Sequence, residues 1–448
     1  MQTTEFLLKS RNVILDDGVH PAVIHVRDGV IANVLDAELL HPDLPMEDVG
    51  DLHVMAGLVD SHVHINEPGR TEWEGFETAT KAAAAGGITT LVDMPLNSTP
   101  VTTTVKSFEA KLSAAEGKLW VDCGFYGGVV PDNRQDIKPL LDAGVLGMKA
   151  FLIHSGIDDF PNSTEADLRS AMPILHDYGA PLLVHCEIGK ELPPYAGDPQ
   201  SYPAYLASRP TSWEHEAIKL VTALAREYRT KTHVVHLASA DAVPGLAASR
   251  TEGLPLTVET CPHYLYFTAE DVPSGDTRFK CAPPIRGRDH RERLWDALRA
   301  GVIDMIVSDH SPTVPELKCL ESGDFQRAWG GIASLQLGLS IIRTEMLHRR
   351  FSFADLVRWM SSTPASLVGL QHRKGALRVG MDADIVVWDP DEEFVVDGAT
   401  LDHRHKLTPY DGEKLQGKVK RTYVRGTLVF KDGKFADNAS GKVLLREG

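Results

Sequence analysis

The segment Gly57-Leu-Val-Asp-Ser-His-Val-His-Ile-Asn-Glu-Pro-Gly69 carries two histidines at the end of a short apolar run. Successive side chains of a strand point to opposite faces, so His62 and His64 share one face and can bind one metal ion. The spacing alone is weak support, because 19 histidines in 448 residues predict about 0.8 such pairs by chance. The preceding apolar residues, Met55-Ala-Gly-Leu-Val59, indicate a buried strand. We therefore expect His62 and His64 to be metal ligands.

A second pair of this spacing, His403-Arg404-His405, lies towards the C-terminus. Asp402, Arg404 and Lys406 surround its histidines with charge. Charged neighbours are typical of a solvated face, so we interpret this pair as an exposed basic loop and not as a metal site.

Short β-rich runs alternate with helical stretches between residues 57 and 370. The helical stretches are Ala-rich, as in Thr78-Ala-Thr-Lys-Ala-Ala-Ala-Ala85, or amphipathic, as in 214–227. Eight repeats of strand and helix predict an α/β fold, the (β/α)8 TIM barrel. The eight runs are 58–64, 89–94, 121–126, 147–152, 181–186, 232–237, 256–261 and 303–308.

Both ends of the chain have a different pattern from the middle. Residues 1–56 and 371–448 alternate apolar and polar side chains around Asp-Gly turns, which predicts β-hairpins. Neither end alone is long enough to form a stable β-sandwich. We therefore predict one small composite β-sandwich domain built from both ends, beside a barrel domain at 57–370.

The composition excludes several classes of partner. A formal net charge of −16 disfavours nucleic acid and anionic membrane surfaces, and the apolar runs are too short and interrupted to span a membrane. Met1-Gln-Thr-Thr-Glu5 lacks the basic-then-apolar order of a signal peptide. The five dispersed cysteines form no disulfide framework. We expect a cytoplasmic protein that acts on a small molecule.

Polar residues of metal-binding type end several of the predicted strands. In a TIM barrel the C-terminal ends of the strands form the active-site face. Any one of these residues has an ordinary alternative, such as a hydrogen-bonded structural histidine or a helix N-cap aspartate. Five strands that all place such residues on one rim point to a metal centre. The candidate ligands are His62, His64, Lys149, His185, His236 and Asp309.

This set of residues suits hydrolysis by a metal-bound hydroxide. Two divalent cations lower the pKa of a bridging water and polarise a carbonyl oxygen, and imidazole favours zinc among the candidate metals. Asp309 can accept the proton of the attacking hydroxide and return it to the leaving nitrogen, which makes it the candidate catalytic residue. Lys149 does not fit as an ammonium, because a cation cannot bind cations.

The His-x-His, lone Lys, two His and Asp on successive strands resemble the cyclic-amidohydrolase branch of the amidohydrolase superfamily. The resemblance covers nearly the whole chain. It implies that Lys149 is carboxylated by CO2 or bicarbonate to N6-carboxylysine, which bridges two divalent ions as an anion. It also implies that His62, His64 and Asp309 hold one ion, that His185 and His236 hold the other, and that the chain forms a homo-oligomer, a tetramer.

The neighbouring residues bear on the substrate. Dihydroorotases place an Arg two residues after the second His, where this chain has Asn66, and a further His where it has Thr313. Without the Arg, a carboxylate lacks its bidentate partner. Hydantoinases carry a Tyr five residues after the bridging Lys, where this chain has His154.

Several further segments resemble those of allantoinases and imply hydrolytic opening of a cyclic ureide, allantoin, in purine breakdown. A hydantoinase or dihydropyrimidinase, or a non-catalytic scaffold relative, remains the alternative. The segments are His64-Ile-Asn-Glu-Pro-Gly-Arg-Thr-Glu-Trp-Glu-Gly75, Asp93-Met-Pro-Leu-Asn97, Lys280-Cys-Ala-Pro-Pro-Ile-Arg286, Ser308-Asp-His-Ser-Pro312 and Trp329-Gly-Gly-Ile332.

Four residues are candidates for substrate binding. Asn97 and the loop of Cys281, Ala282 and Pro283 are expected to grip the ring and its ureido arm, partly through backbone groups. Asn97 is equally compatible with a simple turn after a strand. The loop belongs to the long connection 262–289, whose length and Pro/Gly content predict a functional loop. Trp329 is either a pocket wall or a packed aromatic.

Overall fold

The middle of the chain forms the predicted barrel of parallel strands. The computed structural model describes residues 5–38, 44–189 and 197–447. A parallel bridge between Val63 and His310 joins the first strand to the chain just beyond the last one and closes the ring. Each strand except the short β9 overlaps one of the eight predicted runs. The strands are β6 (Leu58–Val63), β7 (Ile88–Asp93), β8 (Asp122–Phe125) continued by β9 (Gly127–Gly128), β10 (Met148–Phe151), β11 (Leu182–His185), β12 (Thr232–Val234), β13 (Leu256–Thr260) and β14 (Met305–Ile306).

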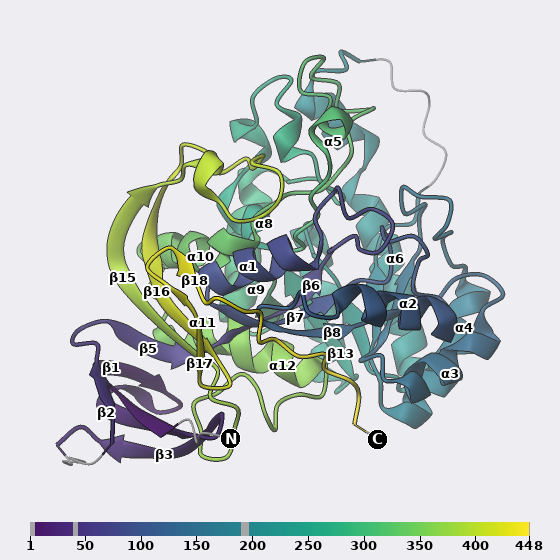
Figure 1. The fold of residues 1–448 in the computed structure, drawn as a ribbon. Coiled ribbons are helices and arrows are strands. Elements are labelled where there is room, and N and C mark those ends of the chain that lie inside the picture. Colours follow the sequence, from purple (N-terminus) through teal and green to yellow (C-terminus); the bar gives the residue numbers. More distant parts are fainter. Residues whose placement is uncertain (1–4, 39–43, 190–196, 448) are drawn as a thin grey trace.

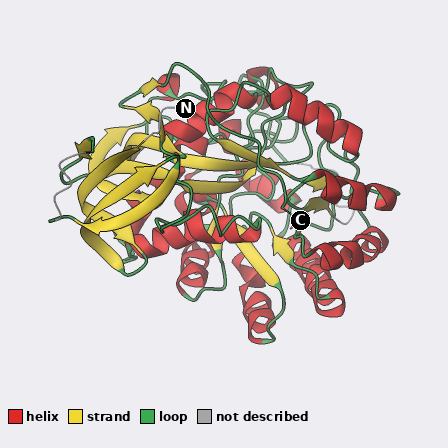
Figure 2. Cartoon of the chain, turned by 60° about the horizontal axis from the view of Figure 1, so that its bottom comes forward, coloured by secondary structure: helices red, strands yellow, loops and turns green. Residues whose placement is uncertain are grey.

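Helices follow the strands and surround the barrel (Figures 1 and 2). Their ends are set by local sequence signals: Thr164 and Asp167 form a capping box at the start of one helix, and Gly179 ends it in the left-handed conformation. The helices are α1 (Phe76–Ala85), α2 (Val105–Ala115), α3 (Arg134–Ala143), α4 (Glu165–Tyr178), α5 (Tyr202–Ser208), α6 (Thr211–Tyr228), α7 (Val243–Thr251), α8 (Pro262–Tyr266), α9 (Arg288–Arg299), α10 (Gly338–Met346), α11 (Phe353–Val357) and α12 (Thr363–Leu367).

Strands from both ends of the chain share one nine-stranded sheet. Its junction is β5, which pairs with β1 in parallel and with β15 in antiparallel fashion. Ile24, Val54 and Ile385 are fully buried in the apolar core of this sheet. The strands are β1 (Glu5–Leu15), β2 (Gly18–Arg27), β3 (Val30–Asp36), β4 (Met46–Asp48), β5 (His53–Ala56), β15 (Ile385–Val395), β16 (Lys414–Val424), β17 (Thr427–Lys431) and β18 (Lys434–Phe435).

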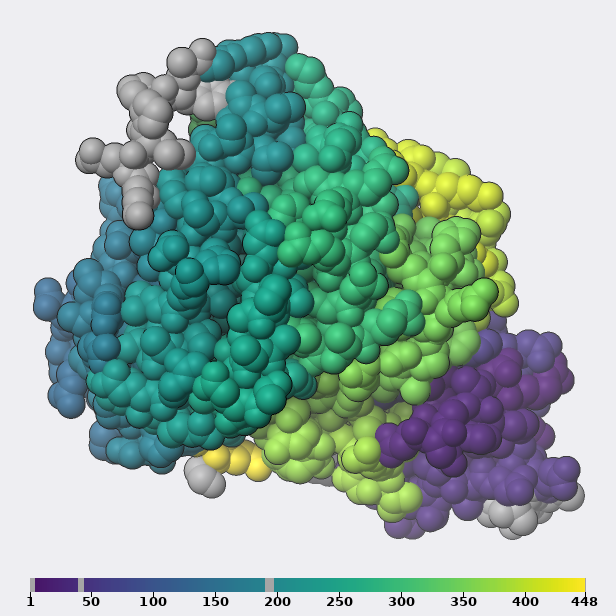
Figure 3. Space-filling view, turned by 180° about the vertical axis from the view of Figure 1, so that it is seen from behind, coloured from purple at the N-terminus to yellow at the C-terminus, as the bar shows by residue number. Residues whose placement is uncertain are grey.

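The sheet lies beside the barrel, and seen from behind its N-terminal strands form a lobe at one side (Figure 3). We propose that residues 57–370 form the barrel domain and that the two flanking ends, 1–56 and 371–448, form the second domain. The C-terminal tail returns to the barrel, because Leu444 N donates to Cys123 O at 2.8 Å. The loop 401–408 also reaches back to the barrel, as shown below.

Among the described residues, no helix combines the length and apolar character needed to cross a membrane.

Candidate metal centre and substrate cavity

Three of the predicted ligands meet at the C-terminal end of the barrel. Asp309 Oδ1 lies 3.3 Å from His62 Nε2 and 3.5 Å from His64 Nε2. All three side chains are buried, and their donor atoms lie close enough together to hold one metal ion. The strand alternation that placed both imidazoles on one face therefore also brings them to Asp309, which follows the eighth strand.

Lys149, His185 and His236 complete the group. The ring of His236 lies 5.5 Å from that of His62 and 4.6 Å from that of His185, measured between centroids. Lys149 is fully buried, and its ammonium faces the ring of Phe151 at 5.0 Å. Among the described residues, neither Lys149 Nζ nor His236 Nδ1 has a hydrogen-bond partner. The structure thus gathers all six predicted residues at one end of the barrel.

These side chains fit a metal centre. Burial lowers the pKa of His64, His185 and His236, which keeps their imidazoles neutral and their lone pairs available. Burial also lowers the pKa of Lys149 to about 8. A buried amine and imidazole without partners are costly, and a metal centre would relieve that cost.

Three residues of this site also adopt a strained backbone conformation. Asn97, His236 and Asp309 adopt φ values of 67°, 40° and 45°, in the left-handed region that side chains with a Cβ rarely occupy. Such residues cost about 1–3 kcal/mol each and gather at functional sites. The fold therefore holds these three side chains at the barrel end against a local preference for other conformations.

Two buried glutamates orient the histidines, and sequence reasoning missed both. Glu259 Oε1 accepts a hydrogen bond from His62 Nδ1 at 2.5 Å, so the other ring nitrogen keeps its lone pair and faces Asp309. Glu187 Oε2 likewise accepts from His185 Nε2 at 2.8 Å. The available signal was a charged residue inside or just after an apolar strand, which must be paired when it is buried.

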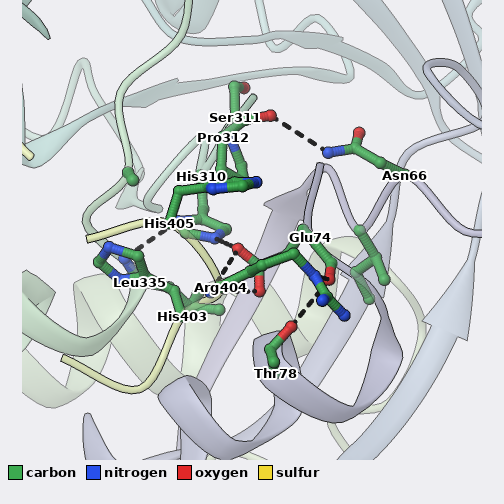
Figure 4. Close-up of polar contacts among 12 residues, drawn as sticks. Asn66, Glu74, Thr78, His310, Ser311, Pro312, Leu335, His403, Arg404 and His405 are labelled. Atoms are coloured by element: carbon green, nitrogen blue, oxygen red, sulfur yellow. Dashed lines mark hydrogen bonds and ion pairs between the residues drawn. The ribbon is translucent and has the colours of Figure 1, made fainter. Parts of the chain in front are cut away.

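Glu74 holds the residue that follows Asp309. His310 Nδ1 accepts the backbone N–H of Ser334 at 3.2 Å, so the proton on Nε2 points to Glu74 Oε2, also at 3.2 Å. Glu74 accepts the backbone N–H of Arg404 as well, at 3.1 Å (Figure 4). Glu74 and His310 are both fully buried.

The interpretation of the second His-x-His pair as a solvated loop was wrong for its first member. His403 is fully buried, and its ring lies 5.6 Å from that of His310. His405 Nε2 contacts the carbonyl of Glu72 at 2.6 Å. His403 is buried because its loop packs on barrel residues, some of which lie 330 positions earlier in the chain. The charged neighbours of His403 do not reveal this packing.

A cavity of about 650 Å³ opens over the ligand residues. Asn97, Cys281 and Ala282 line it, as do His154 and Trp329. Asn97 also approaches the metal side, since its Nδ2 lies 3.4 Å from His64 Nδ1.

Pro283 does not line the cavity. Its carbonyl accepts a hydrogen bond from Tyr264 Oη at 2.7 Å, and Tyr264 is not a lining residue either. Lys149 does not line the cavity either, and its ammonium faces the ring of Phe151, which does. The long connection 262–289 supplies Lys280, Cys281 and Ala282 to the wall, and the structure shows Trp329 both lining the cavity and packing edge-on against Trp73 at 4.9 Å.

Known proteins resemble the chain over its whole length. The model of the amidohydrolase family matches residues 53–429. An allantoinase from Streptomyces avermitilis is 49% identical, with 100% of each chain covered, and one from Arabidopsis thaliana is 45% identical, covering 98% of this chain and 91% of that one. The solved L-hydantoinase (dihydropyrimidinase) from Arthrobacter aurescens superimposes with a TM-score of 0.92 at 32% identity, covering 99% of this chain and 100% of that one.

Proposed function

Since this chain belongs to the amidohydrolase family, we propose that it is a hydrolase that opens the ring of allantoin to give allantoate. The observation that carries the proposal is the complete group of six ligand-type side chains beneath a cavity large enough for a cyclic ureide. Allantoinases similar over the full chain support the choice of substrate.

The residues present support a site for two divalent ions. His62, His64 and Asp309 would hold one divalent ion, and His185 and His236 the other, with a carboxylated Lys149 shared between them. Zinc is the metal that we propose, because imidazole ligands suit it. The ions would supply Lewis acidity towards the ring carbonyl and lower the pKa of water. The pKa of Lys149, lowered by burial to about 8, provides the neutral amine that CO2 requires.

Asp309 moves the proton. One of its carboxylate oxygens accepts the proton released when water adds to the ring carbonyl and then delivers it to the amide nitrogen that leaves. Ser311 Oγ donates to Asp309 Oδ1 at 2.9 Å, which fixes the orientation of the carboxylate. Neighbouring imidazoles keep the pKa of Asp309 well below its usual range despite burial, so the group is an ionised carboxylate before the reaction.

The site offers no cation at the position where a dihydroorotase would bind a carboxylate. Asn66 is buried, and its Nδ2 donates to the carbonyl of Pro312 at 3.2 Å. Asn66 therefore supplies no bidentate cation for a carboxylate, which favours a neutral cyclic ureide over dihydroorotate.

Side-by-side turnover of allantoin, hydantoin, dihydrouracil and dihydroorotate by the metal-loaded protein tests the proposal. We expect kcat/KM to be highest for allantoin, with about two divalent ions bound per chain. Activity on dihydrouracil alone would establish a dihydropyrimidinase instead. Far less than one ion per chain, with no gain on adding zinc and bicarbonate, would indicate a non-catalytic scaffold.

We also propose that the protein is a cytoplasmic homotetramer. Five free cysteines, four of them buried, support a reducing compartment. The tetramer follows from the family resemblance alone. Light scattering on the eluting protein would measure its mass, and a monomer would contradict the assignment.

A further inference from the structure

One wall of the cavity is an irregular segment. Residues 325–331, here called the wall segment, all line the cavity and form neither helix nor strand. Backbone carbonyls outside regular structure need partners when they are buried. Four of these carbonyls accept hydrogen bonds from two lysine side chains.

Lys280 donates hydrogen bonds to the first half of the wall segment, and Lys318 donates to the second half. Lys280 Nζ lies 3.2 Å from the carbonyl oxygen of Gln326 and 2.5 Å from that of Ala328. Lys318 Nζ lies 3.2 Å from the carbonyl oxygen of Trp329 and also donates to that of Gly331. Each lysine thus binds two backbone carbonyls, an arrangement that we call a clamp. The Lys280 clamp and the Lys318 clamp together bind four of the seven carbonyls of the wall segment.

Both lysines are buried at a cost. Lys280 is 9% exposed and Lys318 is 5% exposed, and within the described part of the chain neither ammonium forms an ion pair. Burial lowers the pKa of Lys280 to about 8 and that of Lys318 to about 7. A lysine without a carboxylate is an expensive way to satisfy carbonyls, and a neutral donor such as Gln would serve a purely structural wall at a lower desolvation cost.

The two clamps act at different depths. Gly331 is buried, and a Cβ built on it would lie 2.2 Å from the carbonyl oxygen of Ser311, whose hydroxyl contacts Asp309. The Lys318 clamp therefore lies at the catalytic end. Gln326 and Arg327 are exposed, so the Lys280 clamp lies towards the mouth.

Lys280 also joins the wall segment to two neighbouring parts of the cavity lining, its own loop and Tyr205. Its carbonyl accepts the N–H of Gly331 at 2.8 Å, and its ammonium lies 5.2 Å from the centre of the Tyr205 ring. Tyr205 Oη donates to the carbonyl of Cys281 at 2.7 Å. The wall segment and the 280–282 loop are thereby fixed to one another as one continuous wall, and Lys280 sets the position of that wall.

We propose that Lys280 and Lys318 are positioning residues that determine substrate specificity by holding the wall segment. The inner clamp, Lys318, shapes the part of the cavity that meets the reacting ring, and every cyclic substrate uses it. The outer clamp, Lys280, shapes the part that meets the ring substituent. This inference rests on the proposed function, because allantoin is a hydantoin ring that carries a ureido arm.

The test compares Lys280→Met and Lys318→Met in the metal-loaded protein. Allantoin is the substituted ligand, and unsubstituted hydantoin is measured as a substrate or as a competitive inhibitor. We expect Lys280→Met to lower kcat/KM for allantoin about 10- to 50-fold, mainly through KM, and to change hydantoin binding less than about 3-fold. Lys318→Met should weaken both ligands by a similar factor. Lys280→Gln, which keeps one donor, should recover part of the loss.

The control is Arg343→Met. Arg343 Nε donates to the carbonyl of Pro390 at 3.0 Å, so this variant also removes a cation from a backbone carbonyl, but away from the cavity. It should leave both ligands unchanged. If Lys280→Met affects allantoin and hydantoin equally, or affects neither, the assignment of the outer clamp is overturned.

Amide hydrogen exchange in the metal-free protein gives a readout that does not require turnover. We expect exchange at 325–331 to accelerate at least about 10-fold in either lysine variant, with the barrel strands unchanged. Unchanged exchange at this segment would overturn the proposal. A wild type that ignores allantoin yet shows the accelerated exchange in its variants would instead refute the proposed function and leave the clamps in place.

Discussion

Two fully buried lysines, Lys149 and Lys374, occupy opposite kinds of surroundings. Lys374 lies between the barrel and the composite sheet, with its ammonium 2.7 Å from Asp122 and Asp384 and 2.9 Å from Asp382. Lys149 lies under the cavity without a hydrogen-bond partner among the described residues. Lys374 is stabilised as a cation, and the nearby carboxylates raise its pKa despite burial.

The difference separates a structural lysine from a chemical one. Lys374 joins residues of two segments, 122 from the barrel and 382–384 from the chain that enters the sheet, so its charge holds the fold together. Burial lowers the pKa of Lys149 by more than Glu259 and Asp309 raise it, so its surroundings disfavour the cation. A lysine without a hydrogen-bond partner beside four imidazoles supports the carboxylation that we propose for Lys149.

The largest expected effect is that of Lys149→Ala. Loss of the bridging group should lower kcat by about 1,000-fold or more, while the metal-free variant unfolds at the same temperature as the wild type or higher, since a buried amine has been removed. Calorimetric melting and steady-state rates measure the two effects. Short carboxylic acids should restore part of the activity, and undiminished activity without them would contradict the role of Lys149.

Lys374→Met should show the reverse pattern. Removing the cation leaves three neighbouring carboxylates without it, which should destabilise the protein by about 3–5 kcal/mol. The folded fraction should keep the wild-type KM and kcat. Urea denaturation and initial rates below the transition provide the comparison, and Lys374→Arg, which keeps the charge, should lose less stability. A variant with normal stability but impaired kcat would reverse the distinction between the two lysines.

Two buried glutamates extend the comparison and predict the smallest effect, on pH dependence. Burial raises the pKa of a carboxyl group, but Arg209 and His185 bring that of Glu187 down to about 2. The nearest cation of Glu214 is Arg286 at 3.8 Å, and burial raises the pKa of Glu214 to about 8.

Because its folded-state pKa is raised, Glu214 contributes stability that is complete below the unfolded-state value of about 4.5 and is lost as the pH rises through about 8. Glu214→Gln should therefore reduce the decline in unfolding free energy between pH 5 and 8.5, by an amount on the order of a few kcal/mol. Denaturant titrations at several pH values measure it. An equal decline in both proteins would place the titration elsewhere.

The fold was largely predictable from local pattern. Alternation within each run identifies a strand, and eight alternations with helices leave few topologies other than the barrel. Five of the six candidate ligands lie near or just beyond the end of a strand and Lys149 lies within β10, so the barrel itself brings them together. The orienting role of Glu259 was not predictable, because it depends on His62, which lies 197 positions away.

The second His-x-His pair shows the opposite limit. Its charged neighbours correctly describe Arg404 as exposed, but burial of His403 depends on packing against Glu74 and His310. Composition around a residue reports its local solvation, and only contacts between distant segments decide whether that local preference is overridden. The wall segment is a similar case, since nothing near Gln326 or Trp329 indicates that lysines elsewhere in the chain bind their carbonyls.

The amino-acid sequence by itself determined the barrel, the composite sheet and the identity of the candidate metal ligands, because strand periodicity and residue chemistry are local properties. The tertiary structure alone decided which buried charges are paired, which backbone groups are held by side chains, and how wide the cavity is. These depend on distances between segments that are far apart in the chain, and the free energy of a buried polar group is set by the partner that it meets there.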